Sequence, residues 1–290
     1  MTAGEAASAE WLFFAQRFVT CSSYADEPFV RDRSVPAHIA ELDRLLEKYR
    51  ETSTANRVLR FIVDTLTQRG AVTVKVLDVG VFMGTFSIAM HHVALSMYSR
   101  AIIRAYEANP VLLGGISKNL ALHGVEAGLH LGAVAGQTGY FQLDSSQHLI
   151  SGRLREPGME SSAAALIPTS ALSEIVDFQT GVVKLDIEGW EYRAMGTLID
   201  NPSALDNIFI IEFDCRNDAR RDLASGVRYT QFLWENFEIF DVGNWNWPQP
   251  TILIESSAHL ESLEARNSGA NTDLVCVPRG WSVDKGALII

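Results

Sequence analysis

The chain has 290 residues, of which 47% are hydrophobic and 20% are charged, and its formal net charge at pH 7 is -11. This composition is typical of a folded protein with a sizeable core and excludes an intrinsically disordered chain. The acidic excess argues against a nucleic-acid-binding protein, because contacts to a phosphate backbone need clustered Lys and Arg.

Cysteine content and hydropathy predict the compartment. The three cysteines, Cys21, Cys215 and Cys276, are far apart and odd in number, which fits a reducing compartment better than a disulfide framework. No apolar run approaches the roughly 20 residues that span a bilayer, and no secretory leader pattern opens the chain. We therefore expect a soluble cytoplasmic protein whose partners include no membrane and no nucleic acid.

Residues 1–70 show helical spacing of apolar side chains and no convincing strand. They are predicted to form an N-terminal helical extension, with a loop at residues 22–35 that could close as a lid. The apolar faces of these helices also suggest a homodimer.

From residue 72 onward, apolar strands alternate with helices, a pattern typical of a parallel sheet covered on both faces. The predicted strands are residues 74–79, 101–106, 129–134, 182–185, 207–213, 237–242 and 273–277, and the predicted helices include residues 86–97, 109–123 and 191–198. Residues 135–172 are expected to be an insertion with one small strand at 139–143. The predicted fold class is α/β, with a seven-stranded, doubly wound, mostly parallel sheet in one domain over residues 71–290.

The most informative segment is VVKLDIEGWEYRAM, residues 182–195. It places Asp186 and Glu188 on the turn between a buried strand and a helix, at the edge where open α/β sheets bind small molecules. Both acids could instead only cap the helix, since carboxylates near a helix N-terminus are favourable.

A second turn of this kind lies at residues 75–84, KVLDVGVFMG. Asp78 ends the strand, and Gly80 and Gly84 follow it, where glycine lets a ligand approach the backbone. The spacing D-x-G-x-x-x-G is not the dinucleotide fingerprint G-x-G-x-x-G, because Phe82 stands where that pattern needs glycine.

Glu107 ends the next predicted strand, where an acidic side chain can bind the two hydroxyls of a ribose. Asp78 and Glu107 together fit a nucleoside that carries a cationic amino acid and no pyrophosphate. S-adenosyl-L-methionine is such a ligand.

The motifs VLDVGVFMGTFS, YEANP, NLALHG, IPTSALSEI and VVKLDIEGWEYRAM occur in this order between residues 74 and 214, about half of the chain. In these motifs the chain resembles the FkbM family of class I S-adenosylmethionine-dependent methyltransferases. The resemblance implies a Rossmann-like fold and O-methylation of a small natural product or sugar.

The resemblance also implies the cofactor contacts, which are Asp78, Gly80, Val81, Gly84, Glu107, Asn109, Ala133 and Asp186. Glu107 would hold the ribose, Asn109 and Ala133 would lie near the adenosine, and Asp186 near the transferable methyl group. Val81 and Phe82 differ from the small and amide residues usual at these positions, which bears on how this loop hydrogen-bonds the cofactor.

Methylation of an alcohol needs a group that removes the acceptor's proton. The candidates at the carboxyl edge of the sheet are Asp186 first and Glu212 second, with Glu188 and Asp214 as further carboxylates. No His or Asn completes a ligand set around Asp186, so no metal is expected.

Two tryptophans, Trp245 and Trp247, stand among turn-forming residues in NWNWPQP. They are predicted to form a wall for a small-molecule acceptor, because aromatic faces stack on sugars and planar rings. The loop could instead plug the core.

Other functions stay open at this point. The acceptor could be a carboxylate or a nitrogen, and the unusual Val81 and Phe82 leave room for a nucleoside-binding scaffold without catalysis. An NAD-dependent oxidoreductase is disfavoured by the missing middle glycine.

Overall fold

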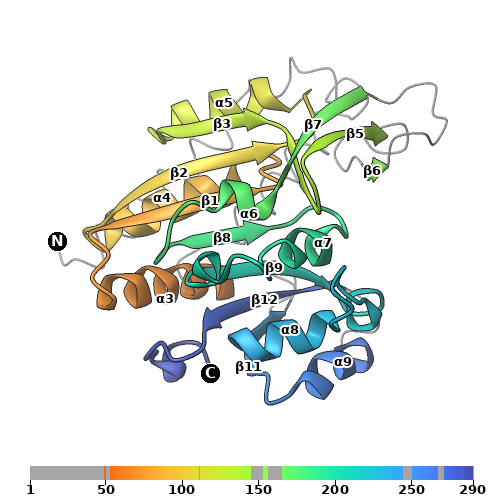
Figure 1. Ribbon diagram of the computed structural model, residues 1–290. Coiled ribbons are helices and arrows are strands. Elements are labelled where there is room, and N and C mark those ends of the chain that lie inside the picture. Colours follow the sequence, from red (N-terminus) through yellow and green to blue (C-terminus); the bar gives the residue numbers. More distant parts are fainter. Residues whose placement is uncertain are drawn as a thin grey trace.

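A mixed β-sheet of eight strands forms the centre of the molecule (Figure 1). This computed structural model describes residues 49, 53–110, 112–144, 153–155, 165–243, 250–266 and 271–289. The strands of the central sheet are β1 (Thr73–Val79), β2 (Arg100–Glu107), β3 (Ala127–Leu131), β8 (Val182–Leu185), β9 (Ile208–Asp214), β10 (Phe237–Gly243), β11 (Ile252–Leu253) and β12 (Asn271–Pro278). Their spatial order is β11-β10-β12-β9-β8-β1-β2-β3.

The strand directions confirm the predicted fold class. Strands β3, β2, β1, β8 and β9 pair in parallel, whereas β12 runs antiparallel to both β9 and β10. Six of the seven predicted strands are present, the seventh is present in part as β3, and the two-residue strand β11 adds an eighth at the edge. The sheet is Rossmann-like. Strands β2 and β3 follow β1 on one side of it, and the later strands, from β8 onward, are added on its other side. This reversal puts a topological switch point between β1 and β8, where open α/β sheets hold their ligands.

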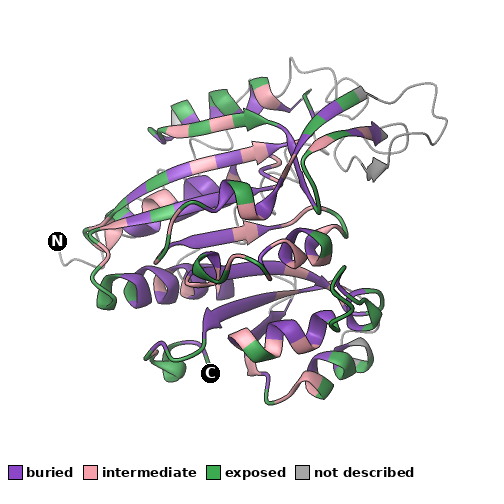
Figure 2. Cartoon of the chain, in the orientation of Figure 1, coloured by how far each residue is buried: buried purple, intermediate pink, exposed green. Residues whose placement is uncertain are grey.

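Helices cover both faces of the sheet, as the doubly wound prediction requires. They are α3 (Thr54–Gln68), α4 (Thr85–Ser96), α5 (Leu113–Leu122), α6 (Leu172–Ile175), α7 (Glu191–Gly196), α8 (Tyr229–Asn236) and α9 (Ser257–Arg266). One core contains buried side chains of α3, α4 and α5, and a second contains those of α6 to α9. The strands between the two cores are largely buried, as Figure 2 shows.

Helix α3 is the described end of the predicted N-terminal extension. The Ser53 hydroxyl caps it by accepting from the Asn56 N–H at 3.1 Å, and its apolar face buries Leu59 and Ile62 in the core beside α4. Residues 1–48 lie outside the described part, so the lid, the homodimer and the domain boundary stay predictions. No helix in the described residues is long and apolar enough to cross a membrane.

Residues 133–171 contribute a second, four-stranded sheet, where the sequence predicted an insertion with one small strand. It contains β4 (Ala133–Ala135), β5 (Gly139–Asp144), β6 (Arg153–Arg155) and β7 (Ala165–Ala171), in the order β4-β7-β5-β6. The predicted strand 129–134 is split, because β3 ends at Leu131 and the chain enters β4 after Gly132. Strand β5 was expected, but β7 was missed because it contains Pro168, which cannot donate a ladder hydrogen bond and disfavours a strand assignment.

Candidate functional site

The turns after β1 and β8 lie side by side, as predicted. Asp78 and Lys184 face each other in the parallel register of the two strands. The Asp186 N–H donates to the Val79 carbonyl at 3.1 Å, and the Gly80 N–H donates to the Tyr106 carbonyl at 3.0 Å. The β1 turn is thereby held between β8 and β2, at the switch point.

Lys184 is the centre of a charge cluster under this turn. Its ammonium lies 3.1 Å from Asp186 Oδ2 and 3.7 Å from Asp78 Oδ1, and it donates to the Gly80 carbonyl at 3.1 Å. The Ser87 hydroxyl donates to Asp78 Oδ2 at 2.6 Å. The Asp78 carboxylate is fully buried, and its Oδ1 accepts no hydrogen bond from the described residues, although the Lys184 ammonium lies within ion-pair distance.

Electrostatics in this cluster keep the lysine charged. Burial alone lowers the pKa of Lys184, but the carboxylates of Asp186 and Asp78 more than offset it, so the pKa lies above the usual range. Burial raises the pKa of Asp78, while Lys184 and the Ser87 hydroxyl counteract this rise. The sequence analysis expected Asp78 to meet a cationic part of the ligand. The structure gives it an internal cation instead, and its cofactor role stays a prediction.

The carboxylate of Glu107 is fixed at the end of β2. Its Oε2 accepts from the Phe82 N–H at 3.0 Å, and its Oε1 accepts from the Asn109 N–H at 2.8 Å. Burial raises the pKa of Glu107, and the two N–H groups lower it. Phe82 has a φ of 54°, an uncommon left-handed conformation for a non-glycine residue, and this turn aims its N–H at the carboxylate.

The two glycines of the β1 turn act differently. A Cβ at Gly80 would lie 1.8 Å from the Asp186 carbonyl oxygen, so only glycine lets the two turns approach this closely. At Gly84 a Cβ would meet the Leu120 side chain at an ordinary 3.5 Å, and the requirement there is the positive φ of 81°.

Two other predicted cofactor contacts have buried side chains. Val81 packs in the core shared with α3 to α5, leaving its backbone to contribute to the turn. Ala133 lies in β4 opposite Thr169 and packs with Leu143 and Ile167. Neither side chain is placed to bind a ligand by polar contact.

The turn after β8 is braced by a buried acid. Glu191 Oε1 accepts from the Ile187 N–H at 2.7 Å, and burial raises the pKa of Glu191 well above its usual range. Glu188 is exposed with a φ of 57°. Glu188 and the 43%-exposed side chain of Asp186 are therefore accessible on this turn, while the buried Glu191 stabilises it.

Glu212, near the end of β9, is an electrostatic neighbour of Asp186 and Glu188. Asn271 Nδ2 donates to its Oε1 at 3.0 Å, and Asp273 stands opposite it in the sheet register. Burial raises the pKa of Glu212 to about 8, and the negative charges of Asp186, Asp273 and Glu188 add to the rise. The structure thus brings together the three predicted catalytic carboxylates, although among the described residues no three metal-ligating side chains gather into an ion site.

Other sequence candidates lie elsewhere. Asp214 stabilises its own turn by accepting from the N–H groups of Arg216 and Asn217, both at 3.0 Å. The predicted acceptor wall, Trp245 and Trp247, falls outside the described residues.

Three site residues were not singled out from the sequence. Lys184 had a visible signal, because it is the only charge in the buried run VVKL. Glu191 was read only as the start of a helix. Tyr49 belongs to the N-terminal extension, yet its buried phenol reaches the Thr85 hydroxyl, and its electrostatic neighbours are Lys184 and Asp78.

Comparisons with known proteins give weak likenesses. No protein-family model and no curated protein matches the sequence. Among solved structures, the chain is similar to methyltransferase FkbM from Methylobacillus flagellatus, with a TM-score of 0.40 and 13% identity, over 92% of this chain and 57% of that one. It is also similar to a putative class I S-adenosylmethionine-dependent methyltransferase from Listeria monocytogenes, with a TM-score of 0.40 and 9% identity over 86% and 69% of the two chains.

A third similar structure is a putative O-methyltransferase from Klebsiella pneumoniae, with a TM-score of 0.39 and 13% identity over 91% and 98% of the two chains. This chain spans only 57% of the length of the FkbM protein. Similarity at this level does not assign an activity or a substrate.

Proposed function

We propose that the protein is an S-adenosylmethionine-dependent methyltransferase that methylates a hydroxyl of a small natural product or sugar. Glu107 carries this proposal, because its carboxylate is fixed beside the switch point by two backbone N–H groups. A carboxylate oxygen has about two lone-pair sites, so each oxygen of Glu107 can still accept from a ribose hydroxyl.

The residues around Glu107 fit such a nucleoside. Glu107 would hold the ribose of the nucleoside, and Asn109 would lie beside it. The turn from Gly80 to Gly84 would contact the rest of the ligand. Lys184 would act on this turn indirectly, since its ammonium holds the Gly80 carbonyl. When bound, S-adenosyl-L-methionine supplies an electrophilic methyl group.

The chain's own chemical task is then to orient the acceptor hydroxyl and take its proton. Glu212 is the better proton acceptor, because a base works best with a pKa near the working pH, and the pKa of Glu212 is raised to about 8. Asp186 forms an ion pair with Lys184 and is partly exposed, which suits it to orient the acceptor. Glu188 is exposed and is an electrostatic neighbour of Glu212.

Activity and acceptor class are tested together by mass spectrometric detection of S-adenosylhomocysteine. The protein is incubated with S-adenosyl-L-methionine and matched acceptors that differ only in carrying a hydroxyl, a carboxylate or an amine. Turnover with hydroxyl acceptors is expected. Turnover with only carboxylates or only amines would support those alternatives, and cofactor binding without any turnover would support a nucleoside-binding scaffold.

A Glu212→Gln variant tests the proton acceptor. Loss of a general base lowers turnover by roughly 10²- to 10⁴-fold, while cofactor affinity is expected to stay nearly unchanged. Glu235→Gln, an exposed substitution on α8, is the matched control. A Glu212→Gln variant with full turnover would remove Glu212 from this role.

A further inference from the structure

The N-terminal extension meets the rest of the chain at the edge of the sheet that carries the site. Helix α3 is joined to β1 by residues 69–72 alone, and it packs beside β1 and α4. It therefore runs antiparallel to β1, and its first residue, Thr54, lies toward the carboxyl end of that strand. Open α/β sheets bind their ligands at this edge. Tyr49 precedes the helix at the same end.

The side chain of Tyr49 is buried next to the β1 turn. It is 2% exposed and belongs to the core that also contains Val81, Met83 and Phe86. Its phenol forms a hydrogen bond with the side chain of Thr85. Burial raises the pKa of Tyr49 above its usual range, so the phenol keeps its proton at physiological pH.

The backbone of Tyr49 is fixed as well. Asn56, in the first turn of α3, is fully buried, and its Nδ2 donates to the Tyr49 carbonyl at 3.4 Å. Buried polar groups depend on such internal partners, because water does not reach them. Tyr49 therefore connects the first turn of α3 to the first turn of α4 by hydrogen bonds.

The β1 turn is held at both of its ends. At its start, the Lys184 ammonium donates to the Gly80 carbonyl at 3.1 Å. At its end, Gly84 is followed directly by Thr85, whose side chain is hydrogen-bonded to Tyr49. Lys184 is also an electrostatic neighbour of Tyr49, so the two groups that support the turn lie in one buried cluster.

We propose that Tyr49 is a positioning residue for the site, because its hydrogen bond to Thr85 keeps the β1 turn in the conformation that receives S-adenosyl-L-methionine. In naming this ligand, the inference rests on the proposed function. It gives the N-terminal extension a part in cofactor affinity through one buried phenol, and it requires no contact between Tyr49 and the cofactor.

Calorimetric titration with S-adenosylhomocysteine compares Tyr49→Phe with the unmodified protein. The variant keeps the buried ring and loses only the hydroxyl, so it is expected to fold. The net loss of one hydrogen bond changes an equilibrium constant roughly two- to tenfold. We expect the affinity for S-adenosylhomocysteine to fall and the KM for S-adenosyl-L-methionine to rise by this factor, while kcat stays within about twofold.

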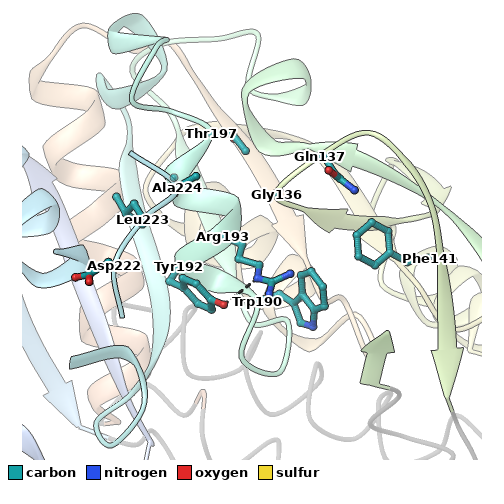
Figure 3. Close-up of a pocket in the computed structure, with 11 residues that line it drawn as sticks. Gly136, Gln137, Phe141, Trp190, Tyr192, Arg193, Thr197, Asp222, Leu223 and Ala224 are labelled. Carbon is teal, nitrogen blue, oxygen red and sulfur yellow. Dashed lines mark hydrogen bonds between the residues drawn. The ribbon is translucent and has the colours of Figure 1, made fainter. Parts of the chain in front are cut away.

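Tyr192→Phe is the matched control, because it also removes a phenol hydroxyl that forms a hydrogen bond. Figure 3 shows Tyr192 beside Arg193 on α7, and its hydroxyl accepts from Arg193 Nε at 2.8 Å. Its ring packs against the other core, which contains side chains of α6 to α9. Tyr192→Phe should leave the affinity for S-adenosylhomocysteine unchanged, and equal weakening by both variants would overturn the inference.

Variants of Thr85 test the partner of the phenol. Thr85→Val removes the same hydrogen bond from the other side, whereas Thr85→Ser keeps the hydroxyl and should keep the affinity. Tyr49→Phe and Thr85→Val together should weaken binding no more than either change alone, because both remove one shared bond. Additive losses would show that the two side chains act separately and would contradict the inference.

Hydrogen exchange without any ligand separates this inference from the proposed function. Within the β1 turn, the Gly84 N–H donates to the Val81 carbonyl at 2.9 Å. Tyr49→Phe should therefore speed exchange in peptides that cover residues 80–88 and leave β9 and β12 unchanged. Equally faster exchange in all strands would show general destabilisation and would overturn the inference.

The two proposals then fail in different ways. Faster exchange at residues 80–88, without binding of S-adenosylhomocysteine to the unmodified protein, would keep the positioning of the turn by Tyr49 and remove the methyltransferase proposal. Binding of S-adenosylhomocysteine that is equally tight in Tyr49→Phe would remove the inference and leave the methyltransferase proposal intact.

Discussion

Replacing Lys184 by Met should destabilise the fold, because it leaves a buried carboxylate without its cation. Asp78 is 0% exposed, and its Oδ1 lies 3.7 Å from the Lys184 ammonium, whose side chain is 13% exposed. At an effective dielectric constant of about 20, this separation corresponds to an attraction of about 4 kcal/mol. Breaking a buried ion pair from one side costs about 3–5 kcal/mol, and we expect a loss in that range for Lys184→Met.

The assay is urea unfolding followed by circular dichroism. Lys75→Met is the matched control, because Lys75 is an exposed residue of β1, the strand that bears Asp78, and this substitution should change the unfolding free energy by no more than about 0.5 kcal/mol. Adding Asp78→Asn to Lys184→Met removes the uncompensated charge and should restore part of the lost stability. The reasoning would be refuted if Lys184→Met cost no more than Lys75→Met, or if the double variant were as unstable as the sum of both changes.

Acid should reduce the defect of Lys184→Met. Burial already raises the pKa of Asp78 in the folded state, and removing Lys184 takes away a charge that lowers it. A raised folded-state pKa gives stability that is present at low pH and is lost as pH rises. The unfolding free energy of the variant should therefore approach that of the unmodified protein as pH falls, and a constant gap across the range would contradict the pairing.

Three further predictions concern the turns and the crevice. Gly80→Ala should cost roughly 1–3 kcal/mol more in urea unfolding than Gly70→Ala, because both have positive φ but only Gly80 would press a Cβ onto a backbone oxygen; equal costs would contradict this packing. Glu107→Gln should weaken S-adenosylhomocysteine binding by about 1–3 kcal/mol in calorimetry, and unchanged affinity in a folded variant would remove its ribose role. The kcat/KM should rise with pH toward about 8 as Glu212 loses its proton, and a profile flat between pH 6 and 9 would exclude Glu212 as the base.

The central sheet could be predicted from the sequence because its strands are buried on both faces. Runs such as VVKL at β8 are apolar whichever face they present, and β8 has the predicted bounds. The second sheet could not be predicted from the sequence, because β7 contains Pro168 and β4 has only three residues. Short strands carry too little periodicity to stand out from loops.

The position of the site could also be inferred from the sequence, but its internal contacts could not. Asp78, Glu107 and Asp186 were placed correctly at strand ends, since strand boundaries fix the edge of a parallel sheet. The burial of Asp78 follows from alternation, because it shares a strand face with Val74 and Val76. Its pairing with Lys184 depends on which strand lies next to β1, and only the topology reveals that neighbour.

Titration calorimetry with S-adenosylhomocysteine, using NAD as the second ligand, tests the central claim most directly. The account predicts micromolar, one-to-one binding of S-adenosylhomocysteine that is lost or weakened in Glu107→Gln, and no binding of NAD. Binding of NAD in its place, or binding of neither ligand, would contradict the assignment of the switch-point site to S-adenosyl-L-methionine.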